Sequence, residues 1–124
     1  MSIRRFEDIE AWKSARKLTN LVYDVTQTSS FGDDRDLKHQ MRRASVSSMA
    51  NIAEGFDAGS DIEFQRFLRI AQRSATEVQS HLYVALDRPY IESASFDALY
   101  AQARETRRLI GGLIKYLQKS CGHT

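Results

Sequence analysis

The sequence predicts an all-α fold, an antiparallel up-down-up-down four-helix bundle made by a single domain over residues 1–124. Three observations predict it. Apolar residues recur at three- and four-residue spacing in four segments, which is the period of an amphipathic helix. One Pro and six Gly leave these segments uninterrupted. The connections are about five residues long, and such short links place neighbouring helices antiparallel.

The first predicted helix covers about residues 8–27 and the second about residues 34–56. Their stripes, in chain order, are Ala11, Ala15, Leu18, Val22 and Val25, then Leu37, Met41, Ala44, Ser48 and Ile52. The stretch TSSFGDD between them holds serines and a glycine, so we expect a loop there. Asp33 or Asp34 begins the second helix, because a negative charge is stabilised at a helix N-terminus.

The third predicted helix covers about residues 61–88 and opens with a capping box. Ser60 and Glu63 have the spacing at which each side chain accepts a hydrogen bond from the other residue's backbone N–H. Pro89 ends this helix, since the residue before a proline avoids helical geometry. The fourth helix covers about residues 94–119. The two stripes are Phe64, Leu68, Ala71, Ala75, Val78, Leu82 and Ala85, then Phe96, Leu99, Ala103, Thr106, Ile110, Leu113 and Leu117.

The first and fourth helices carry more apolar residues than these stripes contain. The additional residues are Phe6, Ile9, Trp12, Tyr23, Leu109 and Tyr116. A helix in a monomeric bundle buries one stripe about 100° wide, so these residues form further apolar flanks. A wider buried stripe with a few exposed apolar residues would also explain them. We expect them instead to form an oligomer interface between copies of the chain.

The composition argues against several kinds of site. A single Cys, Cys121, leaves no disulfide framework and no cysteine metal site. His39, His81 and His123 lie in separate segments, and Glu77 with His81 lacks the spacing and the repeat of di-iron bundles. We therefore expect no metal and no cofactor. Without a signal-like stretch at the start, or about 18 consecutive apolar residues, we expect a cytoplasmic protein that does not span a membrane.

No catalytic constellation is recognisable. Some helical RNases carry an Arg-x4-6-His motif, but Arg35 precedes His39 with three residues between them, and Arg73 precedes His81 with seven. Spacing alone indicates no Ser–His–Asp relation. We expect that the protein is not an enzyme, and a helical RNase is the least favoured alternative.

Asn51 and Glu54 interrupt the apolar pattern near the end of the second helix. Asn51 falls at the edge of the stripe, and Glu54 points further outward. We interpret both as structural. Asn51 is expected to hydrogen-bond across the interface of the second and third helices, and Glu54 to pair with a basic neighbour.

Basic residues align along helix faces, and they are the candidate contacts to nucleic acid: Arg42, Arg43, Arg66, Arg69, Arg73, Arg104, Arg108 and Lys115. The net charge is only +2, so a solvated face with Arg–Glu pairs would also explain them. Residues 104–119, however, carry five basic groups against one acidic group. Repeated around an oligomer, such a patch would attract polyanions.

The segments FEDIEAWKSARKL, LKHQMRRASVSSMANIAEG, SDIEFQRFLRIAQRSATEV and LIGGLIKYLQ together cover most of the chain. In this order they resemble the 23S rRNA intervening-sequence proteins, also called the S23 ribosomal-protein-like family. The residues assigned to the family motif, with a structural role, are Asn51, Ile52, Ala53, Glu54, Gly55, Ser74 and Glu77. Two departures are Ala58, where the family often has a basic residue, and LDRPYI, where a Gly-containing turn is usual. The first weakens any nucleic-acid role of that loop.

This resemblance implies a four-helix bundle that assembles into a ring-like homopentamer, and no catalytic residue belongs to the motif. Some members are encoded inside intervening sequences of rRNA genes. A related accessory protein of diversity-generating retroelements binds a reverse transcriptase and nucleic acid. We therefore expect a non-enzymatic homo-oligomer that contacts RNA or a ribonucleoprotein. A protein-interaction scaffold without nucleic acid is the alternative.

Overall fold

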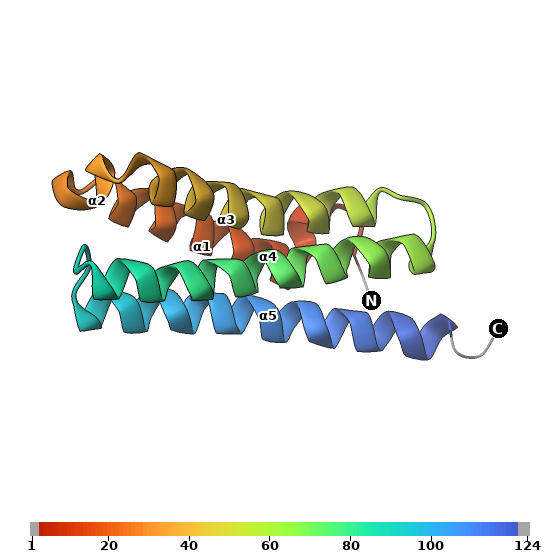
Figure 1. Cartoon of the computed structure of the whole chain (residues 1–124). Coiled ribbons are helices and arrows are strands. Elements are labelled where there is room, and N and C mark those ends of the chain that lie inside the picture. The colour runs from red at the N-terminus through yellow and green to blue at the C-terminus, as the bar shows by residue number, and fades with distance from the viewer. Residues whose placement is uncertain (1–2, 122–124) are drawn as a thin grey trace.

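The computed structural model describes the backbone of residues 3–121 and the side chains of residues 3–119. Within this range the chain is all-α and contains no strand. The elements are η1 (Phe6–Asp8), α1 (Glu10–Thr26), α2 (Ser29–Asp33), α3 (Arg35–Phe56), α4 (Asp61–Asp87) and α5 (Ser93–Cys121). Four of the helices are long and lie side by side as a helical bundle (Figure 1). No helix in the described range combines the length and the hydropathy needed to cross a bilayer.

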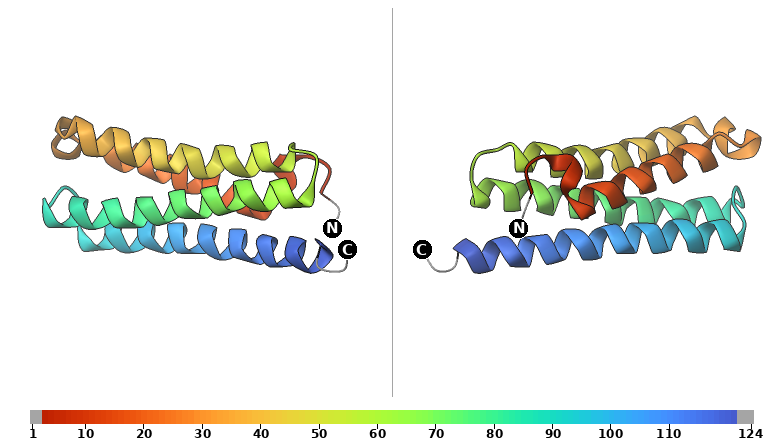
Figure 2. Two further views of the ribbon diagram at one scale, coloured as in Figure 1. Left: turned by 45° about the vertical axis from the view of Figure 1, so that its right-hand side comes forward. Right: turned by 180° about the vertical axis from the view of Figure 1, so that it is seen from behind.

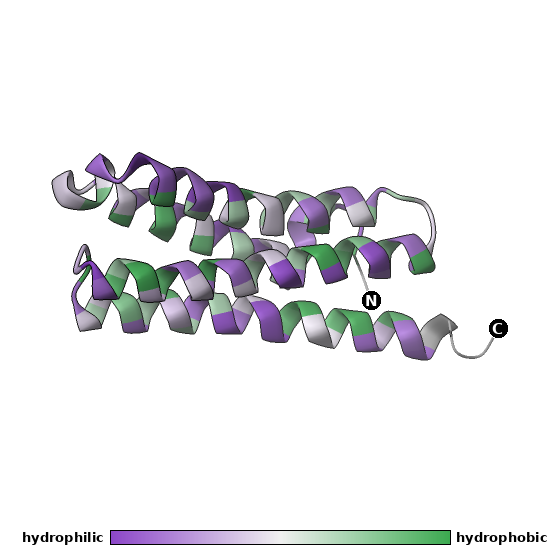
Figure 3. Cartoon of the chain, viewed as in Figure 1, coloured by the Kyte–Doolittle hydropathy of each residue, from purple (hydrophilic) through white to green (hydrophobic). Residues whose placement is uncertain are grey.

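Each long helix packs against two others. Both α1 and α4 contact α3 on one side and α5 on the other, as the views in Figure 2 show. The four predicted stripes face this interior, and among their residues only Val25 and Phe96 stay partly exposed. Figure 3 shows the resulting alternation of hydrophobic and hydrophilic bands along α4 and α5. The 3.6-residue period therefore predicts most of the core, although Ile9, Phe31, Ile91 and Ile114 are also buried.

A buried polar network joins α1 to α5. Ser14 Oγ lies 2.7 Å from Thr106 Oγ1, and Gln102 Nε2 donates to Ser14 Oγ at 2.9 Å. Thr106 also donates to the backbone carbonyl of Gln102. Both hydroxyls are buried, and each has a partner, as buried polar groups require.

The expected loop at TSSFGDD is wrong, because residues 29–33 form the short helix α2. Phe31, near its centre, is fully buried, and its ring centroid lies 5.3 Å from that of Tyr90. A single apolar residue among turn residues produces no period, so the pattern gave no signal of a helix. The first long helix also begins later than predicted, at Glu10, because η1 precedes it.

The predicted helix starts are confirmed at Ser60 and refined at Asp34. The Ser60 hydroxyl accepts from the backbone N–H of Glu63 at 3.2 Å. The reciprocal half of the capping box does not form in the described chain, since the Glu63 carboxylate pairs with Arg66. Asp34 is the N-cap of α3, and its Oδ1 accepts from Leu37 N at 3.1 Å.

Asp34 also anchors the connection between α4 and α5. The Tyr90 hydroxyl donates to Asp34 Oδ2 at 2.9 Å. This hydrogen bond, and secondarily the partial burial of the ring, raises the pKa of Tyr90. A raised folded-state pKa means that the stabilisation is complete below about pH 10 and is lost as the pH rises through the raised value. We expect Tyr90→Phe to reduce the alkaline loss of stability, as measured by urea unfolding at pH 8 and pH 11.

The wild-type protein is the reference for this comparison, because the two proteins differ only in the Tyr90 hydroxyl. Identical differences in unfolding free energy between the two pH values would contradict the assigned role of the Tyr90 hydroxyl.

Candidate functional site

The outward side of α5 carries a basic flank and an apolar flank. A basic pocket of about 500 Å³ is lined by Gln72 of α4 and by Arg104, Arg107, Arg108, Gly111, Gly112 and Lys115 of α5. An apolar pocket of about 490 Å³ opens between α5 and the start of α1. Arg108 and Gly112 line both pockets. The two flanks therefore meet along one line on α5.

Arg107 is fixed to α4 at the floor of the basic pocket. Its Nη1 donates to Gln79 Oε1 at 2.9 Å, and Gln72 Nε2 donates to the backbone carbonyl of Arg107 at 3.2 Å. The Arg107 Nε is buried and has no hydrogen-bond partner. Arg107 contributes to the charge of residues 104–119 but is not among the predicted contacts to nucleic acid. Its half-buried place beside two glutamines was not visible from spacing.

The charges in the pocket are unequal. Glu105 pairs with Arg108, and this hydrogen bond lowers the pKa of the carboxyl and raises that of the guanidinium. Arg108 is thereby neutralised locally. Arg104, Arg107 and Lys115 take part in none of the ion pairs of the described side chains. The three together give the pocket its positive charge, and no carboxylate lines it.

The other predicted basic contacts lie elsewhere. Arg42 donates through Nε to Thr26 Oγ1 at 2.9 Å and lies 4.3 Å from the ring centroid of Tyr23, so it ties α3 to α1. Arg66 pairs with Glu63. The remaining three, which are exposed and outside the pocket, are Arg43, Arg69 and Arg73. The structure therefore brings Arg104, Arg108 and Lys115 together and leaves the rest apart.

An aromatic cluster, Tyr83 with Phe96 and Tyr100, adjoins the basic pocket. The Tyr83 ring makes edge contacts with Phe96 at 5.0 Å and with Tyr100 at 5.9 Å between centroids, and the Phe96 and Tyr100 rings stack at 5.4 Å. The proximity of Tyr100 raises the pKa of Tyr83. The sequence pattern does not predict this cluster, because its members come from two helices, α4 and α5.

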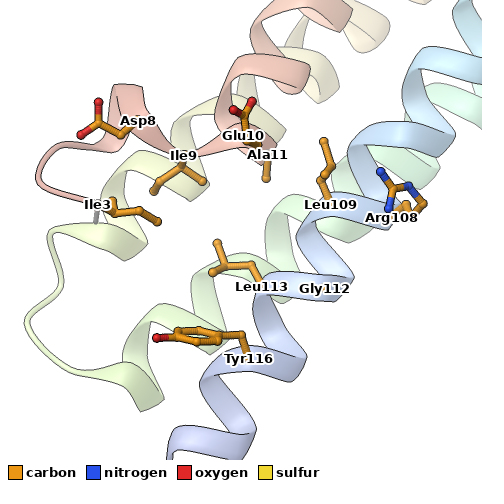
Figure 4. Close-up of a pocket in the computed structure, with 10 residues that line it drawn as sticks. All are labelled: Ile3, Asp8, Ile9, Glu10, Ala11, Arg108, Leu109, Gly112, Leu113 and Tyr116. Carbon is orange, nitrogen blue, oxygen red and sulfur yellow. The ribbon is translucent and has the colours of Figure 1, made fainter. Parts of the chain in front are cut away.

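The apolar pocket contains part of the predicted oligomer interface. Figure 4 shows Ile3, Ile9 and Ala11 facing Leu109, Leu113 and Tyr116 across it. Tyr116 is 47% exposed, whereas Ile9 is only 2% exposed. Ile9 is thus a core residue of the single chain, which corrects its assignment to an exposed flank. Of the remaining predicted interface residues, Phe6 and Trp12 pack on each other and Tyr23 lies beneath Arg42.

The Asn-Ile-Ala-Glu-Gly motif forms a packing contact between α3 and α4. Ile52 is fully buried, and a Cβ at Gly55 would lie 2.7 Å from Phe67 Cβ. The expected partner of Asn51 is wrong, because Asn51 Nδ2 donates to the carbonyl and hydroxyl of Ser47 on its own helix. Ser47 then reaches across to Ser74 at 3.0 Å.

The two acidic motif residues behave differently. Glu54 takes part in none of the ion pairs of the described side chains, so its expected basic partner is not found. It lines a pocket of about 470 Å³ together with Ala53, Arg4 and Arg5. Glu77 pairs with His81 at 3.2 Å. Among the described residues no group of three His, Cys, Asp or Glu could hold a metal ion, and His123 lies outside that range.

Comparisons with known proteins agree on the fold. A sequence model of the 23S rRNA-intervening sequence protein family matches residues 7–112. A crystal structure of a protein of unknown function from the S23 ribosomal protein family of Bacteroides thetaiotaomicron is similar, with a TM-score of 0.77 and 20% identity. The match covers 85% of this chain and 98% of that chain, and at such identity it shows the fold alone. None of the curated proteins matches this chain.

Proposed function

Because this chain belongs to the 23S rRNA-intervening sequence protein family, we propose that it is a non-enzymatic, homo-oligomeric bundle that binds RNA through the basic flank of α5. The RNA is either free or part of a ribonucleoprotein or reverse-transcriptase assembly in the cytoplasm. The finer architecture belongs to the same proposal. It is one up-down-up-down four-helix domain over residues 1–124, repeated as a pentameric ring.

The observation that carries the RNA proposal is the basic pocket. It joins three cations without carboxylate partners, Arg104, Arg107 and Lys115, on one helix flank. The phosphate backbone of a nucleic acid supplies the matching charge, and neutralising it releases counterions. In an oligomer this pocket would recur on every copy, so a weak single contact would become a multivalent one.

A charge-reversal pair tests the RNA proposal. We expect Arg104→Glu with Lys115→Glu to weaken RNA binding strongly and to make the slope of log K against log salt shallower by about 1 for each lost phosphate contact. Fluorescence anisotropy with a labelled RNA between 50 and 300 mM salt measures both effects.

The matched control changes the net charge equally at Arg43 and Arg73, which are exposed outside the pocket. We expect Arg43→Glu with Arg73→Glu to retain most of the affinity and the slope. RNA affinity that is absent, or that does not depend on salt, would rule out the proposal. A partner protein that is still captured after nuclease treatment would then favour the scaffold alternative.

The apolar pocket supports self-association. Leu109 is partly exposed, Tyr116 is exposed, and a Cβ at Gly112 would meet nothing within 4 Å, so a second helix can approach closely there. We expect light scattering at micromolar concentration to give a mass near five times 14.2 kDa. Leu109→Glu with Tyr116→Glu should shift the mass toward one chain, because buried unpaired carboxylates are costly.

Val46 offers the control for this variant, since it is a 42% exposed apolar residue of α3. Val46→Glu should leave the mass unchanged. A wild-type mass of 14.2 kDa would contradict the proposed assembly.

A further inference from the structure

The aromatic cluster presents exposed ring surface at one end of the bundle. Tyr83 is 51% exposed although it contacts both Phe96 and Tyr100. Those two rings are partly buried and pack against the core, whereas the outer face of Tyr83 is open to solvent. Capping the core explains Phe96 and the inner side of Tyr100. It does not explain why the Tyr83 side chain remains half exposed.

The cluster is continuous with the basic pocket. Tyr100, Arg104, Arg107, Gly111 and Lys115 follow one another at three- and four-residue intervals, so they share one flank of α5. The Arg104 guanidinium lies 6.0 Å from the centroid of the Tyr100 ring. From Tyr100 to Lys115 the flank is about 22 Å long, at about 1.5 Å of rise per residue.

The α4 residues that form hydrogen bonds with this flank are uncharged. Gln72 and Gln79 both bond to Arg107, and Tyr83 follows Gln79 by one turn. The strip therefore has aromatic faces at one end and cations along the rest, with neutral amides beside them. Glu105, which follows Arg104 in the sequence, is already paired with Arg108.

We propose that this aromatic–basic strip binds single-stranded nucleic acid, with bases stacked on Tyr83 and Tyr100 and phosphates at Arg104, Arg107 and Lys115. This inference rests on the proposed RNA binding and specifies the form of the ligand. A duplex keeps the faces of its bases stacked on each other, so it can use the cations but not the rings. A single strand offers both its phosphates and its free base faces, and stacking on aromatic side chains accepts any base.

The experiment compares the RNA affinity of variants that lack an aromatic ring at Tyr83 or Tyr100 with that of a variant that keeps it. Anisotropy titrations use an unstructured 12-nucleotide RNA and a 12-base-pair RNA duplex. We expect Tyr83→Leu and Tyr100→Leu each to weaken binding of the single strand by about tenfold. The salt slope and the affinity for the duplex should not change. Tyr83→Phe should bind like the wild type, because it keeps the ring.

Val46→Ala is the matched control, since Val46 is a similarly exposed apolar residue but lies on α3, outside the strip and outside both pockets of α5. It should leave the affinity for the single strand unchanged. Thermal unfolding checks that each variant is folded, and Tyr83→Leu removes little core because its ring is half exposed.

The outcomes separate the two proposals. If both leucine variants bind the single strand like the wild type while Arg104→Glu with Lys115→Glu weakens it, the aromatic role is overturned and RNA binding stands. Equal wild-type affinity for the duplex and the single strand also overturns the inference. If the wild type binds neither RNA, the proposed function fails together with it.

Discussion

Replacing Phe31 by Ala should lower the free energy of unfolding by about 3–5 kcal/mol, a large part of the total stability of a small domain. Phe31 is fully buried, and its ring packs against Tyr90 and the core residues at that end of the bundle. The five-residue helix α2 places this ring, and removing it would leave a cavity in the core cluster that contains Leu18, Val22 and Leu82. Urea unfolding followed by circular dichroism measures the loss.

Ser30→Ala is the control for Phe31→Ala, because Ser30 is exposed in the same short helix. Its unfolding free energy should stay within about 0.5 kcal/mol of the wild type. A loss below about 1 kcal/mol for Phe31→Ala would show that α2 does not hold the ring in the core.

Gly55→Ala should lower the free energy of unfolding by about 1–3 kcal/mol through overpacking. An added Cβ would lie 2.7 Å from Phe67 Cβ, 3.0 Å from Phe64 Cδ1 and 3.3 Å from the Phe64 carbonyl oxygen. Two of these atoms belong to the backbone or are fixed to it, so α3 and α4 must separate to admit the methyl group. The measurement is urea unfolding at equal protein concentration.

The same substitution at Gly112 is the matched control for Gly55. A Cβ there meets nothing within 4 Å, and Ala is favoured over Gly inside a helix by about 0.5–1 kcal/mol. We therefore expect Gly112→Ala to stabilise the single chain. If the two alanine variants change the unfolding free energy with the same sign, the close contact of α3 with α4 is not what requires glycine at Gly55.

The four long helices and most of the core could be predicted from the sequence because each helix buries one regular stripe. An apolar period indicates a buried face only when it is repeated over several helical turns. The helices α3, α4 and α5 are long enough to repeat it many times. Phe31 shows the limit of this signal, since one buried residue in a five-residue helix repeats nothing. Its burial depends on the contact with Tyr90, which is distant in the sequence.

The candidate site was predicted less completely because charge alone does not tell which partner a side chain has. Arg42 and Arg104 look alike in the sequence, yet one is held against Thr26 and the other lines the basic pocket. The aromatic cluster was missed for a related reason. The Tyr83 and Tyr100 rings contact each other only when α4 packs on α5, and no pattern within one helix predicts that contact.

The hydrogen bond between Ser14 and Thr106 fixes the position of α1 along the axis of α5. If α5 slid by one turn, about 5.4 Å, Ser14 would lose both Thr106 and Gln102, and a buried group without a partner costs about 1–3 kcal/mol. These hydrogen bonds therefore oppose sliding in addition to the apolar packing, because their partners lie at one position along the helix axis. The two helices therefore keep one axial register. A molecule that docks on α5 meets a surface whose alignment with α1 is set before binding.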